Sequence, residues 1–180
     1  MIRTYQKSIG SPILTFHDGE QAGLLRQIVV DPENGKIVGL VVLAKIHRRM
    51  KTMTIAGIDI LEWGKNIIIQ DESSFSEPGE IIRLASILKE KNFIYKKSVF
   101  TLNGNYVGQV SDYFFDSESL VIIKLLIRET KWFFWVTERI ISVLKIIEIK
   151  KDRIIIEDLQ PKKTVSKDIV KSSQETAPAV

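Results

Sequence analysis

The sequence predicts an all-β protein made of two small antiparallel β-barrels, joined by a linker that contains one amphipathic helix. Three observations lead to this expectation. β-Branched and aromatic residues gather in short runs between turn-forming residues, which is typical of strands. The chain repeats itself at a spacing of about 85 residues. Only one stretch has the periodicity of a helix that packs on one side.

The internal repeat carries the prediction of two modules. When Gly19–Val42 is set beside Gly104–Ile127, no gap is needed, and IIIQDE from Ile67 later matches IIIEDL from Ile154. The order of elements is therefore kept over nearly the whole module. The residues that coincide in the first pair of segments are Gly19 with Gly104, Gly23 with Gly108, Asp31 with Asp116, Glu33 with Glu118 and Leu40 with Leu125.

The repeat divides the chain into four parts. We assign residues 1–75 to the first barrel, 76–95 to the linker, 96–160 to the second barrel and 161–180 to a tail whose polar composition predicts disorder. The strand candidates of the first barrel are Thr15–Phe16, Gly23–Val30, Lys36–Lys45, Lys51–Ile55 and Asn66–Gln70.

Turn residues mark the hairpins of both modules. Asp31–Gly35 reads DPENG, in which proline presets the turn and Asn-Gly tolerates positive φ. Its counterpart Asp116–Leu120 lacks the glycine, so we expect a different geometry there. The glycines lack the strand, helix and Gly-Lys-Ser/Thr ending of a phosphate loop. We therefore predict structural turns at Gly19, Gly23, Asp31, Gly35, Gly104, Gly108 and Asp116.

The linker contains the predicted helix, Glu80–Lys91. Ile81, Leu84 and Leu88 share one face. A partner groove could receive that face, but the sequence favours a bridging element that packs on one or both barrels.

The order of strands, turns and apolar positions resembles the PRC-barrel family, over Ser11–Glu72 and again over Lys97–Leu159. The resemblance rests on Gly19, Gly23, Asp31, Gly39 and IDILEWGKNIII in the first copy, and on Gly104, Gly108, Asp112, Asp116 and RIIIED in the second. It implies a small, strongly bent antiparallel sheet that closes into a barrel. It also implies function through protein partners, without a catalytic motif.

Composition restricts the function classes further. The chain has no cysteine and a formal net charge of +4. It shows no secretory signal and no apolar run long enough to span a membrane, so we expect a cytoplasmic protein. No catalytic, dinucleotide or metal motif is present, and His17 and His47 have no metal-binding spacing. We therefore expect no enzyme activity, cofactor, metal or small-molecule substrate.

Two segments are candidates for contact with a partner. The first is the aromatic strand Trp132, Phe133, Phe134 and Trp135, flanked by basic residues. It indicates a protein or membrane-surface contact, or an interface within the assembly. The second is the basic cluster Lys45, His47, Arg48, Arg49 and Lys51, which is either a phosphate contact or a solvated connection.

These segments support three functional hypotheses. The favoured one is a non-catalytic adaptor or scaffold that binds a protein partner, or itself, through its barrels. In that hypothesis the first barrel is mainly scaffold and the second carries the contact. The alternatives are an accessory factor for ribosome or RNA maturation, and a peripheral membrane-associated assembly factor.

Overall fold

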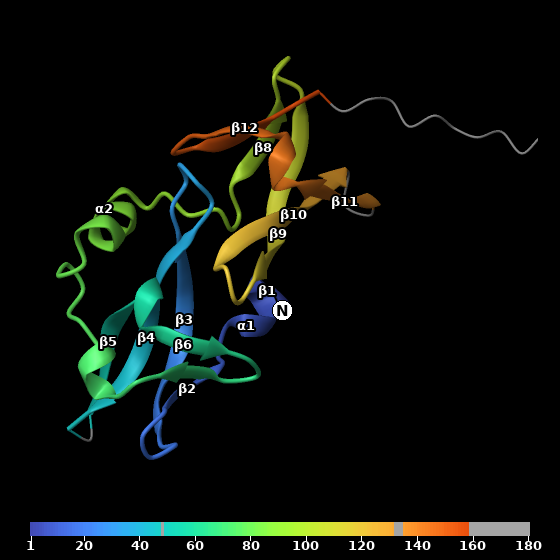
Figure 1. The fold of residues 1–180 in the computed structure, drawn as a ribbon. Coiled ribbons are helices and arrows are strands. Elements are labelled where there is room, and N and C mark those ends of the chain that lie inside the picture. Colours follow the sequence, from blue (N-terminus) through green and yellow to red (C-terminus); the bar gives the residue numbers. More distant parts are fainter. Residues whose placement is uncertain (48, 132–134, 159–180) are drawn as a thin grey trace, which may run out of the picture.

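A computed structural model describes residues 1–47, 49–131 and 135–158, without the side chains of residues 131 and 135 (Figure 1). The described chain consists mostly of strands with few helices, as the sequence predicts. Arg48, Trp132, Phe133, Phe134 and the tail at 161–180 lie outside the described residues.

The strands form two sheets with the same internal order. The first sheet, in the order β5-β4-β3-β2-β7-β6, contains β2 (Pro12–Thr15), β3 (Gln21–Val30), β4 (Ile37–Ile46), β5 (Arg49–Ala56), β6 (Ile60–Trp63) and β7 (Ile67–Ile69). The second, in the order β11-β10-β9-β8-β13-β12, contains β8 (Ser98–Thr101), β9 (Tyr106–Asp116), β10 (Val121–Lys131), β11 (Trp135–Ser142), β12 (Ile146–Ile149) and β13 (Arg153–Ile156). We call β2–β7 the first unit and β8–β13 the second unit.

The two units also share the direction of their strand pairs. β2 pairs parallel with β7, and β8 pairs parallel with β13. The other pairs of both units are antiparallel. The strand β6 lies in a segment where the sequence analysis placed no strand.

The sheets are not closed barrels, which corrects the predicted architecture. Within the described residues, β5 and β6 end the first sheet, and β11 and β12 end the second, without pairing to each other. Strands β6 and β7 have only four and three residues, so they can form only a few backbone hydrogen bonds with a further strand. Instead of two separate barrel interiors, one continuous cluster of buried apolar side chains draws on both units.

The two units meet through their equivalent turns. The amide of Ile37 donates to the carbonyl of Leu120 at 2.7 Å, and the amide of Ile122 donates to the carbonyl of Gly35 at 3.0 Å. Because Gly35 corresponds to Leu120 and Ile37 to Ile122 in the repeat, these two bonds are reciprocal. The contact therefore has the self-complementary form of a two-fold interface, within one chain.

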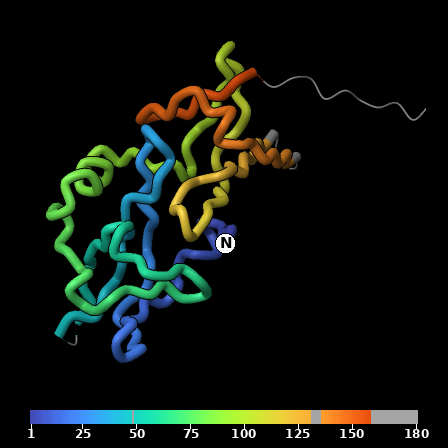
Figure 2. Tube along the Cα trace, in the orientation of Figure 1, coloured from blue at the N-terminus to red at the C-terminus, as the bar shows by residue number. Residues whose placement is uncertain are grey.

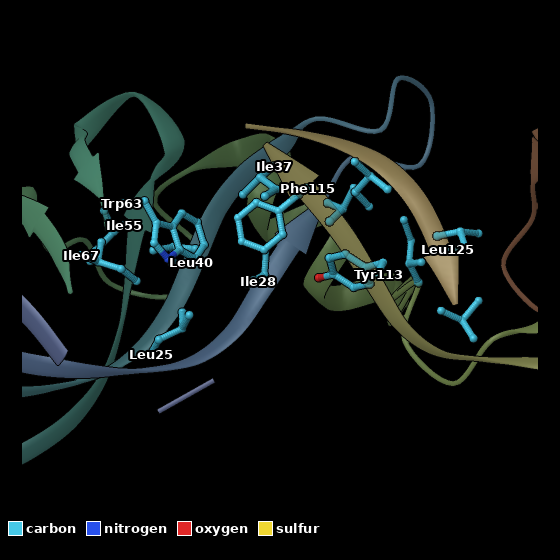
Figure 3. Packing of buried hydrophobic residues seen from close by; sticks show 14 of the residues in the cluster. Leu25, Ile28, Ile37, Leu40, Ile55, Trp63, Ile67, Tyr113, Phe115 and Leu125 are labelled. Carbon is cyan, nitrogen blue, oxygen red and sulfur yellow. The ribbon is translucent and has the colours of Figure 1, made fainter. Parts of the chain in front are cut away.

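Aromatic side chains continue this junction into the core. The ring of Trp63 from β6 lies 4.8 Å from the ring of Phe115 from β9, centroid to centroid. Figure 3 shows the two rings side by side, with Ile37 next to them. The core therefore does not stop at the boundary between the units.

The turn without glycine keeps the backbone geometry of the turn that has it. Gly35 has a φ of 69°, and Leu120 has a φ of 54°. Asp31 and Asp116 also accept equivalent amide bonds, from Glu33 at 2.9 Å and Glu118 at 3.4 Å. The expected difference in geometry is therefore wrong at this position. Leu120 adopts this left-handed conformation, which is unfavourable for leucine, because the hydrogen bonds between the paired turns hold the backbone there.

The helix α2 (Ile82–Glu90) lies where the linker helix is predicted and packs on the first sheet. Leu84 and Ile87 are buried against Val29 of β3. Gly39 permits this packing, because a Cβ at residue 39 would lie 2.3 Å from Cδ1 of Leu84 and 2.4 Å from the carbonyl oxygen of Ile55. The helix therefore serves as a bridging element attached to the first unit.

An ion pair anchors the same helix. The guanidinium of Arg83 donates two bonds to the carboxylate of Asp31, at 2.9 Å and 2.6 Å, and lies 3.0 Å from Glu33. Asp31 is only 5% exposed. The bonds from Arg83 hold the pKa of the Asp31 carboxyl below its usual value. Helix and hairpin are thus joined by both apolar and charged contacts.

The chain start packs on the second unit. Strand β1 (Ile2–Thr4) pairs with β9, and the single-turn helix α1 (Tyr5–Ser8) follows it. The ring of Tyr5 lies 4.9 Å from that of Tyr113. Figure 2 shows the N-terminal end of the chain, in dark blue, beside the second unit.

Three short 3-10 helices complete the described elements: η1 (Gly57–Asp59), η2 (Glu72–Ser74) and η3 (Val143–Lys145). Within the described part of the chain, no helix has the length and apolar character that crossing a bilayer requires.

Candidate functional site

The described residues of the two segments that the sequence singles out belong to equivalent pairs of strands. The basic cluster spans the end of the β4–β5 hairpin, where Ile46 pairs with Arg49. Of the aromatic segment, Trp132, Phe133 and Phe134 lie outside the described residues, and the backbone of Trp135 pairs with Lys131 at the end of the β10–β11 hairpin. The sequence alone does not relate these two segments. The first matching parts of the repeat end at Val42 and Ile127, before either segment begins.

The basic cluster borders a polar cleft of 630 Å³. Lys45 and His47 line it together with His17, although the two histidines are 30 residues apart. Four carboxylates line it as well: Asp18, Glu20, Asp71 and Glu72. The cleft is therefore mixed in charge, and it does not focus positive potential as a phosphate site would.

Two of these carboxylates are stabilised in the ionised form. A hydrogen bond from the Thr15 hydroxyl lowers the pKa of Asp18, with a further contribution from the amide of Glu20. Bonds from the hydroxyl and amide of Ser73 lower the pKa of Asp71. They can accept hydrogen bonds but are poor proton donors near neutral pH. Among the described residues, no group of three histidine or acidic side chains could hold a metal ion.

The rest of the basic cluster is partly neutralised. The ammonium of Lys51 forms an ion pair with Glu77, which follows η2. Arg49 is exposed on β5, and Arg48 lies outside the described residues. The cluster therefore presents fewer unpaired cations than the sequence alone suggests.

A second candidate surface is the outer face of the second sheet, which we define by Phe114, Lys124, Leu126, Arg128, Val136, Glu138 and Ile140. Cross-strand partners share a face of a sheet. The register pairs Leu126 with Ile140, Arg128 with Glu138 and Thr130 with Val136. Ile140 is 60% exposed and Val136 is 54% exposed. The face thus presents apolar side chains around one ion pair.

That ion pair is well formed. Nη2 and Nε of Arg128 lie 2.6 Å and 3.0 Å from Oε1 of Glu138. It joins β10 to β11 between the two apolar positions, so it gives the outer face a fixed polar centre.

The equivalent face of the first sheet is covered. Its residues Val29, Gly39 and Thr54 correspond to Phe114, Lys124 and Ile140, and they lie under α2 or residues 76–77. Thr54 is fully buried and hydrogen-bonded to the carbonyl of Ser76. In the second unit, no described element takes the place of α2. Lys124 stands where the first unit has Gly39, and its side chain would prevent a helix from packing as closely as α2 does on the first sheet.

Residues 92–161 match the family model of the PRC-barrel domain. The matched segment includes all strands of the second unit, β8 to β13. The second unit is therefore similar to the PRC-barrel domain. No curated protein matches the chain.

Proposed function

We propose that this chain is a non-catalytic adaptor that binds a protein partner through the outer face of the second sheet, and that its first unit is a second copy of the PRC-barrel module. The support for a second copy is that the two sheets share strand order, strand direction and the reciprocal turn contact. The first unit, with α2 on its outer side, then acts as scaffold.

The observation that carries the binding proposal is the difference between the two outer faces. In the first unit the apolar positions are buried under α2, whereas Val136 and Ile140 of the second unit are more than half exposed. Exposed apolar side chains around a fixed ion pair are typical of protein contacts, where apolar groups supply affinity and polar groups supply register.

The alternative of RNA binding is less well supported by the basic cluster. Its Lys45 and His47 face four carboxylates across the polar cleft, and its Lys51 is paired with Glu77. A protein that neutralises phosphates needs unopposed cations. We therefore treat RNA and membrane association as outcomes of the experiment.

The test is affinity capture by the full chain from a native lysate treated with nuclease. We expect a stoichiometric protein partner whose capture is reduced about tenfold by Ile140→Asp, because a buried aliphatic contact contributes about 1.5 kcal/mol. Leu102→Asp is the matched control, since Leu102 is 63% exposed on the same unit but is not one of the residues that define the outer face.

Three results would contradict the proposal. One is equal loss of capture in both variants. Another is a partner that is captured only from untreated lysate, and not from nuclease-treated lysate, with a steep dependence on salt, which indicates RNA. The third is sedimentation with anionic liposomes in place of a protein partner.

A further inference from the structure

An apolar groove lies where the turn of the first unit meets the second unit. Its volume is 450 Å³, and its walls include Pro32, Gly35, Leu125, Val143, Ile147 and Ile149. Figure 2 shows the turn at residues 31–36 beside the β12 strand. The groove is on the opposite face of β10 from the candidate surface above, because the neighbouring residues Leu125 and Leu126 point to opposite sides.

The internal two-fold relation places a second, equivalent region on the other side of the junction. There Leu120 stands in place of Gly35, and Trp63 stands in place of Ile149. Two smaller cavities, of 390 Å³ and 320 Å³, are found in that region, and Leu120 lines both. On that side the Trp63 side chain lies in the shared core and the Leu120 side chain packs against it, with two separate cavities remaining, whereas the glycine side has one groove.

The groove has room for the side chain that it lacks. A Cβ placed on Gly35 would meet no atom within 4 Å. Its backbone φ of 69° is close to the 54° of Leu120, so the same turn presents a leucine on one side and none on the other. The groove can therefore accept an aliphatic side chain at the place where the equivalent turn carries that of Leu120.

The charged residues at the groove indicate which residues of a partner would flank the bound aliphatic side chain. Glu33 and Glu148 line it, and no lysine or arginine is among its lining residues. Arg83 and Lys150 reach these carboxylates from outside, at 3.0 Å and 3.3 Å, and neutralise them in part. The remaining acidic character complements basic neighbours of the bound side chain.

We propose that this groove binds a leucine-sized aliphatic side chain of a partner protein, carried on a short segment with basic residues on both sides. The segment inserts its side chain as Leu120 inserts on the equivalent side. The site is separate from the outer face of the second sheet, so it can be tested without regard to binding there.

The experiment is methyl NMR of the full chain with labelled isoleucine, titrated with a pentapeptide that has leucine at its centre and lysine at both ends. We expect saturable shifts of the Ile146, Ile147 and Ile149 methyl groups. Replacing the peptide leucine by glycine should weaken binding at least tenfold, because the apolar contact is lost. Replacing both lysines by glutamate should weaken it several-fold.

Two variants test the placement. Gly35→Leu fills the groove and should abolish the shifts, while Leu120→Gly, the same turn position on the other side, should leave them unchanged. Should Gly35→Leu fail to fold, Ile147→Ser is the second variant. Ile147 is half exposed, and its loss should weaken binding several-fold, with Ile146 and Ile149 as reporters.

The proposal is overturned by any of three results. These are shifts of equal size with the glycine peptide, an unchanged titration in Gly35→Leu, and binding of free 4-methylpentanamide without binding of the peptide. Equal affinity for the glutamate-ended peptide would overturn the basic character of the partner. An Ile140→Asp variant should keep the titration whatever its effect on affinity capture, so failure of the adaptor proposal and failure of this one are distinguishable.

Discussion

Gly39→Ala should detach or distort the contact between α2 and the first sheet. The added methyl group would lie 2.3 Å from Cδ1 of Leu84 and 2.4 Å from the carbonyl of Ile55, so both the helix and the paired strand must move. Overpacking of a buried site costs about 1–3 kcal/mol. Partial exposure of Leu84, which is fully buried, adds about 1 kcal/mol. We expect the free energy of unfolding to fall by about 2–4 kcal/mol.

Urea denaturation measures this loss, and hydrogen exchange locates it. Amides of α2 should exchange faster in Gly39→Ala, while those of β9 and β10 should change less. Gly64→Ala is the control, because its Cβ would meet nothing closer than a side-chain oxygen of Glu62 at 3.4 Å, and we expect a change of about 0.5 kcal/mol or less. A loss under about 1 kcal/mol in Gly39→Ala would refute the close contact.

A double mutant sharpens the test. Leu84→Ala removes the side-chain atom that the new methyl group meets but leaves the clash with the Ile55 carbonyl. The combined loss should therefore be smaller than the sum of the two single losses, by about 1 kcal/mol. Additive losses would mean that the strand contact alone is responsible.

Two further predictions concern buried charges. Arg83→Ala leaves the carboxylate of Asp31 buried without its partner and should cost about 2 kcal/mol at pH 7. Because the pKa of Asp31 is lowered in the folded state, this difference from the natural chain should shrink as the pH falls below about 4. Urea titrations at several pH values measure it, and a difference that persists in acid would disprove the ion-pair origin. Burial lowers the pKa of Lys97 from 10.5 to about 8, so the unfolded chain binds more protons between these values and stability should rise with pH there. The rise should be at most about 3 kcal/mol. Lys97→Met should remove that rise while leaving the side chain of Asn92 and the carbonyl of Lys150 unpaired. An unchanged slope would show that another group titrates in this range.

The local elements could be predicted because their signals are local. Strands β3 and β4 follow runs of β-branched residues, and the Asp31–Gly35 turn follows its DPENG chemistry. The helix α2 follows from the spacing of Ile81, Leu84 and Leu88. The bulged strand β6 was missed because it is short and its polar Glu62 interrupts the apolar run.

The candidate sites could be predicted only in part. The aromatic and basic segments stand out by composition, but their equivalent positions on two hairpins depend on strand pairing. The polar cleft brings His17 and His47 together through loops that are distant in sequence. The exposed Ile140 resembles a core residue in the sequence, since apolar character does not tell which face of a sheet is covered.

The sequence by itself determined the internal repeat, the order of strands, the linker helix and the resemblance of the second unit to a PRC-barrel domain, because each depends on residues close along the chain or on their recurrence. Only the tertiary structure decided that the sheets stay open, that their turns pair reciprocally and that one core joins them. It also decided that a groove opens beside Gly35, whereas Leu120 packs against the core on the equivalent side. The turn contact, the shared core and the groove arise from contacts between residues more than 50 positions apart, such as Trp63 with Phe115, and no local pattern specifies which side chains meet across that distance.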